Sequence, residues 1–87
     1  MKPIIIDVRE PQEYAKGHVD DAINIPPSEL MSGSEYINGL DKDTPLILYC
    51  VSGSRSNVAL QLLKQQGFTN LTNGINADHV NKHYGIS

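Results

Sequence analysis

Short apolar runs alternate along the chain with stretches in which apolar residues recur at helical spacing. The runs are continuous or β-branched, as is typical of strands covered on both faces, and they predict strands over residues 4–8, 22–25, 46–49 and 68–71. Helical spacing and end signals predict helices over residues 11–16, 54–66 and 76–83, with single helical turns over 28–31 and 35–39. We therefore expect an α/β domain with a mainly parallel central sheet flanked by helices.

The segment 54–66 carries the clearest helical pattern. Gly67 is expected to end this helix, and its buried face is expected to hold four apolar residues, Val58, Ala59, Leu62 and Leu63. Further along the chain, Asn73 and Gly74 form a dipeptide that favours turns. We predict a turn there, between the last strand and the last helix.

Size and composition fit a single globular domain over residues 1–87. In a chain of 87 residues only about two thirds or less of the unfolded surface can be buried, so the core is thin. Apolar residues make up 39% and charged residues 20%, as in ordinary globular proteins. The net charge is −3 with no basic stripe, and no apolar run approaches the roughly 18 residues of a membrane span. We expect neither nucleic acid nor a membrane as a partner.

Cys50 is the only cysteine, which excludes a disulfide within the chain. A free thiol is most at home in a reducing compartment, and the apolar part of the N-terminus before Asp7 is too short for a signal peptide. We expect a monomeric, cytoplasmic protein, or a periplasmic one if this chain is a processed form.

Cys50 directly follows a predicted strand and opens a polar loop that leads into a helix. The loop residues, which we expect to bind the substrate, are Val51, Ser52, Gly53, Ser54 and Arg55. Backbone N–H groups in such a turn and the positive end of the helix dipole favour an anion, and a nearby guanidinium lowers the pKa of a thiol from about 8.5. A cysteine at the end of a core strand can instead be a small buried hydrophobe. The polar, glycine-containing loop favours a reactive thiol.

Other polar residues that could look catalytic are explained better by structure. Asp7 and Arg9, beside a strand end, are expected to form an ion pair, and His18, which follows a helix stop, is expected to be structural. His79 and His83 lie four residues apart, a spacing that can bind zinc on one helix face, but no third ligand is evident. We expect no metal and no cofactor.

Several motifs, distributed over almost the whole chain, fit one family. They are Ile6-Asp7-Val8-Arg9-Glu10-Pro11 with Glu13-Tyr14, then Gly17-His18-Val19, then Ala22-Ile23-Asn24-Ile25-Pro26, and the loop from Cys50 to Arg55. This set resembles the single-domain rhodaneses, a sulfurtransferase family, and especially its short members associated with phage-shock operons. The resemblance implies a small three-layer domain in which Cys50 accepts a sulfane sulfur and holds it as a persulfide among loop amides. The family commonly has Gly-Gly and a Trp after the last strand, where this chain has Asn73-Gly74 and no Trp.

The resemblance further implies a thiosulfate sulfurtransferase. Cys50 would take a sulfur from thiosulfate or a similar donor and pass it to an acceptor such as cyanide, a small thiol or a thioredoxin-like dithiol protein. The loop between Cys50 and Arg55 is tighter than the one with which related phosphatases and arsenate reductases bind a tetrahedral oxyanion. Arg55 either binds the sulfonate end of the donor or fixes the loop by pairing with a carboxylate. The alternative from another class is a catalytically weak rhodanese-like module for binding or redox sensing.

Overall fold

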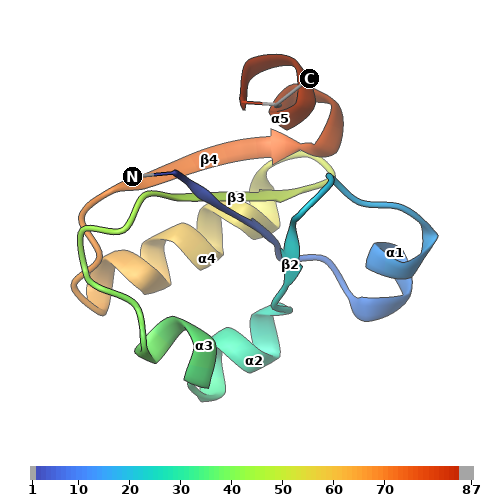
Figure 1. Cartoon of the computed structure of the whole chain (residues 1–87). Helices are drawn as coiled ribbons and strands as arrows, with labels where there is room; N and C mark the ends of the chain where they lie inside the picture. Colours follow the sequence, from blue (N-terminus) through green and yellow to red (C-terminus); the bar gives the residue numbers. More distant parts are fainter. Residues whose placement is uncertain (1, 85–87) are drawn as a thin grey trace.

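The computed structural model describes residues 2–84, in which the four strands form one parallel sheet in the order β2-β1-β3-β4 (Figure 1). In chain order the elements are β1 (Ile4–Asp7), α1 (Pro11–Lys16), β2 (Ile23–Asn24), α2 (Pro27–Ser32), α3 (Glu35–Asn38), β3 (Leu46–Cys50), α4 (Ser54–Gln65), β4 (Leu71–Asn76) and α5 (Ala77–Tyr84). The α/β class and the parallel sheet expected from the sequence are confirmed.

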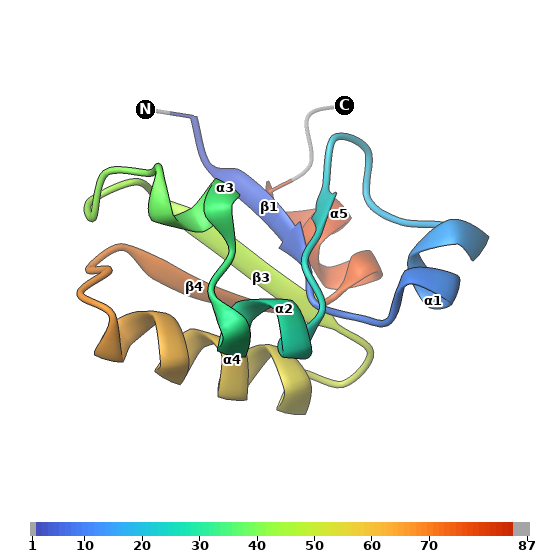
Figure 2. The same ribbon diagram turned by 90° about the horizontal axis from the view of Figure 1, so that it is seen from below.

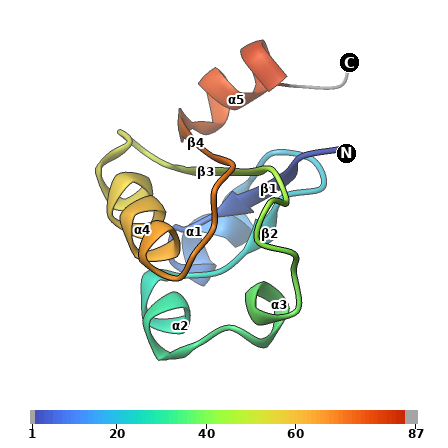
Figure 3. The ribbon, with the colours of Figure 1, turned by 90° about the vertical axis from the view of Figure 1, so that its left-hand side faces the viewer.

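Helices cover both faces of the sheet, which gives the expected three layers. Helices α2, α3 and α4 lie on one face and α5 lies on the other (Figure 3). Helix α1 lies beyond the carboxyl ends of the strands, near the turn that joins β3 to α4 (Figure 2). In an open parallel sheet this carboxyl edge is where ligands bind.

Strand β3 runs through the centre of the molecule and is buried along its whole length. Its side chains alternate between the two faces, as strand geometry requires. Leu46, Leu48 and Cys50 join the core under α4, whereas Ile47 and Tyr49 join the core under α5. The larger core consists of Ile6, Val8, Ile25, Leu30, Ile37, Leu46, Leu48, Cys50, Ala59, Leu63 and Phe68, and the smaller one of Val19, Ala22, Ile47, Tyr49 and Val80.

The short helix α1 forms where its end signals predict it. Pro11 occupies the first turn, where a missing N–H costs nothing, and the Glu13 carboxylate accepts the N–H of Glu10 at 3.0 Å. Gly17 ends the helix with its N–H bonded to the carbonyl of Tyr14 at 3.1 Å. This helix therefore places the Glu13 carboxylate at the carboxyl edge of the sheet.

The prediction for the last strand is wrong. Strand β4 covers Leu71–Asn76 rather than residues 68–71, and the predicted turn at Asn73 and Gly74 lies inside it. Asn73 pairs with Leu48 and Ile75 pairs with Tyr49, so Gly74 is the extra residue of a bulge. A Cβ on Gly74 would lie 2.5 Å from Cγ2 of Val80. The glycine is needed for close packing of β4 against α5, and not for a turn.

The buried face of α4 differs from the prediction at two residues, Val58 and Ser56. Val58 is 66% exposed, while Ser56, Ala59 and Leu63 are the buried residues of the helix and Leu62 is partly buried. A face defined by positions 56, 59 and 63 turns position 58 toward solvent. This orientation of α4 about its axis places the Ser56 hydroxyl at the end of β3.

Among residues 2–84, every helix is too short or too polar to cross a lipid bilayer.

Candidate active site

The Cys50 sulfur lies at the carboxyl end of β3, under the first turn of α4. The residue is only 3% exposed. Its Sγ accepts hydrogen bonds from the backbone N–H of Gly53 at 3.2 Å and of Ser56 at 3.4 Å, and the Ser56 hydroxyl lies 3.5 Å away. The first N–H groups of a helix have no partner inside the helix, so they are free to bind a negative charge here.

The turn between strand and helix depends on the backbone of Gly53. Gly53 has φ +96°, in the left-handed region that L side chains rarely adopt. This conformation directs its N–H toward Sγ while its carbonyl accepts the N–H of Asn57 at 2.9 Å, the first hydrogen bond of α4. One glycine thus joins the strand end, the sulfur contact and the helix start.

The Cys50 thiol is acidic for a cysteine despite its burial. Burial raises the pKa, but hydrogen bonds from the Ser56 hydroxyl and from the N–H groups of Ser56, Gly53 and Ser52 together bring the pKa down to about 7. A substantial fraction of the sulfur is therefore thiolate, the nucleophilic form, at neutral pH.

The structure places the predicted substrate-binding residues around the sulfur in two groups. Val51, Ser52 and Gly53 form the turn, and Val51 is 57% exposed at its outer side. Ser54 and Arg55 form the first turn of α4, where the Ser54 hydroxyl lies 3.3 Å from that of Ser52. We expect these five residues to border the path by which a substrate reaches Cys50.

Ser56 and Asn73 belong to the site but were missed by the sequence interpretation. The Ser56 hydroxyl donates to Oδ1 of Asn73 at 2.7 Å, and Nδ2 of Asn73 donates to the carbonyl of Gly53 at 3.0 Å. Oδ1 of Asn73 also accepts the N–H of Ile75 at 3.0 Å. Ser56 could have been found, since the free N–H groups of a helix extend through its third residue. Asn73 could not, because its dipeptide context indicates a turn.

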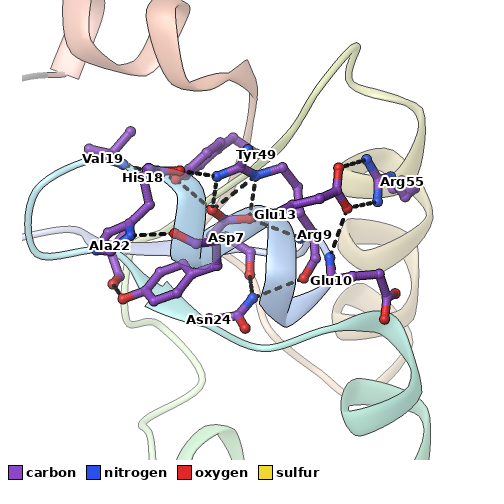
Figure 4. Close-up of polar contacts among 12 residues, drawn as sticks. Asp7, Arg9, Glu10, Glu13, His18, Val19, Ala22, Asn24, Tyr49 and Arg55 are labelled. Carbon is purple, nitrogen blue, oxygen red and sulfur yellow. Dashed lines mark hydrogen bonds and ion pairs between the residues drawn. The ribbon is translucent and has the colours of Figure 1, made fainter.

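Arg55 pairs with a carboxylate, one of the two roles left open by the sequence. Its guanidinium binds Glu13 of α1 through Nη1 to Oε1 at 2.8 Å and Nη2 to Oε2 at 3.1 Å (Figure 4). This bidentate pair lowers the pKa of Glu13 to about 2, with a further contribution from the N–H of Glu10. The pair joins α1 to the start of α4 across the carboxyl edge of the sheet.

On the other face of the sheet, Asp7 is the centre of a buried polar anchor (Figure 4). Arg9 binds its carboxylate at 2.7 Å, as the sequence predicted, and the Tyr49 hydroxyl donates to it at 2.8 Å. The Tyr49 oxygen also accepts the N–H of Val19 at 3.0 Å. Burial, together with the hydrogen bond to Asp7, raises the pKa of Tyr49 to about 12, although the Val19 N–H opposes the shift. The anchor fixes the loop after β1 and belongs to the scaffold.

The histidines lie apart from this chemistry. The His18 ring stacks on Tyr14 with ring centroids 3.6 Å apart, and its Nδ1 lies 2.9 Å from the carbonyl of Tyr14. His79 and His83 lie side by side on α5, with ring centroids 4.3 Å apart. Within the described residues, no three His, Cys, Asp or Glu side chains gather in a way that could hold a metal ion.

Comparisons with known proteins agree with the geometry. Residues 1–79 match the model of the rhodanese-like domain family. The chain is 42% identical to the uncharacterized protein YqhL of Bacillus subtilis over 72 residues, which cover 83% of this chain and 55% of that protein. It is 34% identical over 68 residues to the thiosulfate sulfurtransferase GlpE of Pseudomonas entomophila, covering 78% of this chain and 60% of the relative. The chain thus spans little more than half the length of these two relatives.

A solved structure described as a rhodanese with anions from E. coli superimposes with a TM-score of 0.78. The identity is 32%, and the match covers 88% of this chain and 89% of that one. The similarity therefore extends over most of both chains. Together with the family match, it shows that the chain belongs to the rhodanese-like domain family.

Proposed function

We propose that this domain is a sulfurtransferase that carries a sulfane sulfur on Cys50 as a persulfide. The observation that carries the proposal is the pair of backbone N–H groups, from Gly53 and Ser56, that donate to a sulfur whose pKa is about 7. The Pseudomonas relative is a thiosulfate sulfurtransferase by name, which supports the same chemistry.

In the first half-reaction the Cys50 thiolate attacks the outer sulfur of thiosulfate. A bond forms between Sγ and that sulfur, the sulfur–sulfur bond of thiosulfate breaks, and sulfite leaves with the bonding electron pair. The negative charge of the thiolate moves to the terminal sulfur of the persulfide. No proton is transferred, so the step needs no general base, which agrees with the stacking of His18 on Tyr14.

In the second half-reaction a thiophilic acceptor attacks the terminal sulfur. With cyanide, a carbon–sulfur bond forms, the sulfur–sulfur bond of the persulfide breaks, and the electron pair returns to Cys50 as a thiolate. A small thiol or a thioredoxin-like dithiol protein would serve as an acceptor in the same way. Two displacements through one covalent intermediate predict ping-pong kinetics.

The first turn of α4 would stabilise the charge in both half-reactions. Its N–H groups already point at the sulfur before the reaction begins, so they need no reorganisation when the persulfide forms. The Arg55 guanidinium, which stands 37% exposed at the rim, would attract an anionic donor while it remains paired with Glu13. A thiol that must stay reduced between turnovers suits the cytoplasm.

The test is intact mass spectrometry after incubation with thiosulfate. We expect the protein to gain the mass of one sulfur atom and to lose it when cyanide is added, with release of thiocyanate. The Cys50→Ser variant should show neither change. The Asn57→Ala variant, altered at an exposed position of α4, should behave like the unmodified protein.

Two results would contradict the proposal. The first is a sulfur mass gain or thiocyanate release that persists in Cys50→Ser. The second is the absence of both in the unmodified, folded protein with thiosulfate and with a small persulfide as donors. The second result would favour the alternative, a rhodanese-like module that binds a partner or senses redox state without turnover.

A further inference from the structure

Asn73 binds both residues whose N–H groups donate to the Cys50 sulfur. Its Nδ2 donates to the carbonyl of Gly53 at 3.0 Å, and its Oδ1 accepts the Ser56 hydroxyl at 2.7 Å. Gly53 and Ser56 in turn donate to Sγ at 3.2 and 3.4 Å. One amide side chain on β4 therefore holds the turn and the helix start on either side of the sulfur.

We propose that Asn73 is a positioning residue of this site, which keeps the N–H groups of Gly53 and Ser56 aimed at the Cys50 thiolate. The inference rests on the proposed function only in taking Cys50 as the nucleophile. It assigns a role in the site to a residue of β4, a strand that does not carry the thiol.

The backbone of Asn73 is held firmly in the sheet. Its backbone pairs with Leu48 of the fully buried strand β3, and its Oδ1 also accepts the N–H of Ile75. Ile75 has φ +72°, a strained conformation for a β-branched residue, so this bond helps to hold the bulge in β4. A side chain fixed on a strand positions its partners more precisely than one on a free loop.

The two partners of Asn73 lack an equivalent anchor. Gly53 has no side chain, and its left-handed backbone could rotate readily without the two hydrogen bonds that its carbonyl accepts, from Asn57 N–H and Asn73 Nδ2. The Ser56 hydroxyl carries a single proton, which lies within reach of both Oδ1 of Asn73 and Sγ, and the contact with Asn73 at 2.7 Å keeps the hydroxyl oxygen 3.5 Å from Sγ. Loss of Asn73 would loosen both contacts at once.

Asn73 could also act in the opposite sense, by competing with the thiolate for the Ser56 proton. Competition would raise the pKa of Cys50, whereas positioning lowers it. The competition concerns the hydroxyl of Ser56, which is the contact that lowers the pKa of Cys50 most. Asn73 also fixes the place of that hydroxyl and of both N–H groups, and we expect the loss of all three contacts to outweigh the release of one proton. The sign of the measured change decides between the two effects.

Charged groups near the sulfur are not altered by changes at Asn73. Arg55 of α4 is paired with Glu13 of α1, and Glu10 lies near the same guanidinium. Strand β4 contributes only neutral side chains. On α2, Leu30 faces the shared core while the carboxylate of Glu29 is exposed. A change in the titration of Cys50 in an Asn73 variant would therefore report the contacts of Asn73 itself.

The test compares Asn73→Ser and Asn73→Ala with the unmodified protein. A serine at this position keeps a hydroxyl that can bond to the N–H of Ile75, but it is too short to bind the carbonyl of Gly53. The titration midpoint of Cys50 is measured from the ultraviolet absorbance of the thiolate and from the pH dependence of its alkylation by iodoacetamide. We expect both variants to raise the midpoint by about half to one pH unit, as for the weakening of one net hydrogen bond. Asn70→Ala, at an exposed position before β4, should leave it unchanged.

A double-variant cycle with Ser56→Ala tests the route of the effect. If Asn73 acts through Ser56 and Gly53, the shift caused by Asn73→Ala should be smaller in the Ser56→Ala background than in the unmodified protein. Additive shifts would overturn the route through Ser56. An unchanged or lower midpoint in Asn73→Ser would overturn the proposal, and this variant decides the question if Asn73→Ala does not fold.

The outcome is independent of sulfur transfer. The midpoint is measured on the thiol without any donor, so failure of the unmodified protein to gain sulfur would contradict the proposed function alone. Conversely, a protein that transfers sulfur but shows no shift in its Asn73 variants would contradict the positioning role alone.

Discussion

Arg55 and Glu13 form a bidentate ion pair that joins the first turn of α4 to α1, 42 residues apart in sequence. Both side chains are about one third exposed, so the pair is reachable by solvent and salt. Its position at the carboxyl edge makes it the bridge between the two elements that border the Cys50 turn. The contribution of this ion pair to stability can be measured separately from activity, by following thermal unfolding as a function of pH.

We expect Glu13→Gln to lower the melting temperature at neutral pH but not at strongly acidic pH. The pKa of Glu13 falls from 4.5 to about 2 in the folded protein, so its carboxylate stabilises the fold above about pH 4.5 and that contribution is lost as the pH falls toward 2. Thermal unfolding of both proteins across this range checks the result. Added salt should shrink the difference, because the pair is exposed.

The control for this experiment is Asp78→Asn, which breaks the far more exposed pair with Lys82 on α5. It should change the melting temperature less than Glu13→Gln does. A difference for Glu13→Gln that stays constant down to pH 2 would show that the charge of Glu13 does not stabilise the fold.

We expect the rate of persulfide formation from thiosulfate to follow the ionisation of Cys50. The pKa of the thiol is lowered to about 7, and only the thiolate is nucleophilic. The rate should therefore level off above pH 7 and fall about tenfold per pH unit well below it. Initial rates of mass gain at constant ionic strength give the profile. A midpoint near that of a free thiol, about 8.5, would contradict the hydrogen-bond assignment.

We expect Gly53→Ala to destabilise the protein by about 1–2 kcal/mol through its backbone alone, the cost of a left-handed L residue. A Cβ at this position would find its nearest neighbour, Cγ2 of Ile75, at 3.5 Å, an ordinary contact, whereas φ is +96°. Chemical denaturation measures the change. Gly39→Ala is the matched control, because Gly39 has helical angles and a Cβ there would also make only ordinary contacts, the nearest with the carbonyl oxygen of Glu35 at 3.6 Å, so it should change stability little.

We expect Tyr49→Phe to cost about 1–3 kcal/mol of unfolding free energy, because it removes one hydrogen bond to the buried Asp7 carboxylate and leaves the Val19 N–H without its partner. The Tyr49 oxygen is the partner of both the Asp7 carboxylate and the Val19 N–H. Its side chain faces away from Cys50, so the titration midpoint of the thiol should not move. Tyr36→Phe, at an exposed position, is the control for stability. A shift of the Cys50 midpoint in Tyr49→Phe would show that the two faces of the sheet are coupled.

The sequence predicts most of this fold because its strands are marked by continuous apolar runs and its helices by strong end signals. Pro11 and Gly17 bound α1, and Gly67 follows the end of α4, as expected. Strand β4 has no such run, since its sequence Leu71–Asn76 is half polar. Its place in the sheet is set by packing against β3 and α5, which local pattern does not report.

The candidate site could be predicted in part. The thiol, the left-handed glycine and the helix start follow from local sequence. The partner of Arg55 does not, because Glu13 comes near it only after the chain has crossed the sheet. The same holds for Asn73, whose dipeptide with Gly74 looks like a turn until the close contact of Gly74 with Val80 is known. The local sequence pattern does not show contacts between residues that are distant in the chain.

The burial of Cys50 has a consequence for the proposed transfer of sulfur to an acceptor. A thiol can attack either sulfur atom of a persulfide. Attack on the inner sulfur gives a mixed disulfide and releases hydrosulfide. Attack on the outer sulfur transfers that sulfur to the attacking thiol. Because Cys50 is 3% exposed, the protein would surround the inner sulfur of the proposed persulfide, and only the outer sulfur would be open to attack. Burial of Cys50 would thus prevent a mixed disulfide between this cysteine and the acceptor thiol.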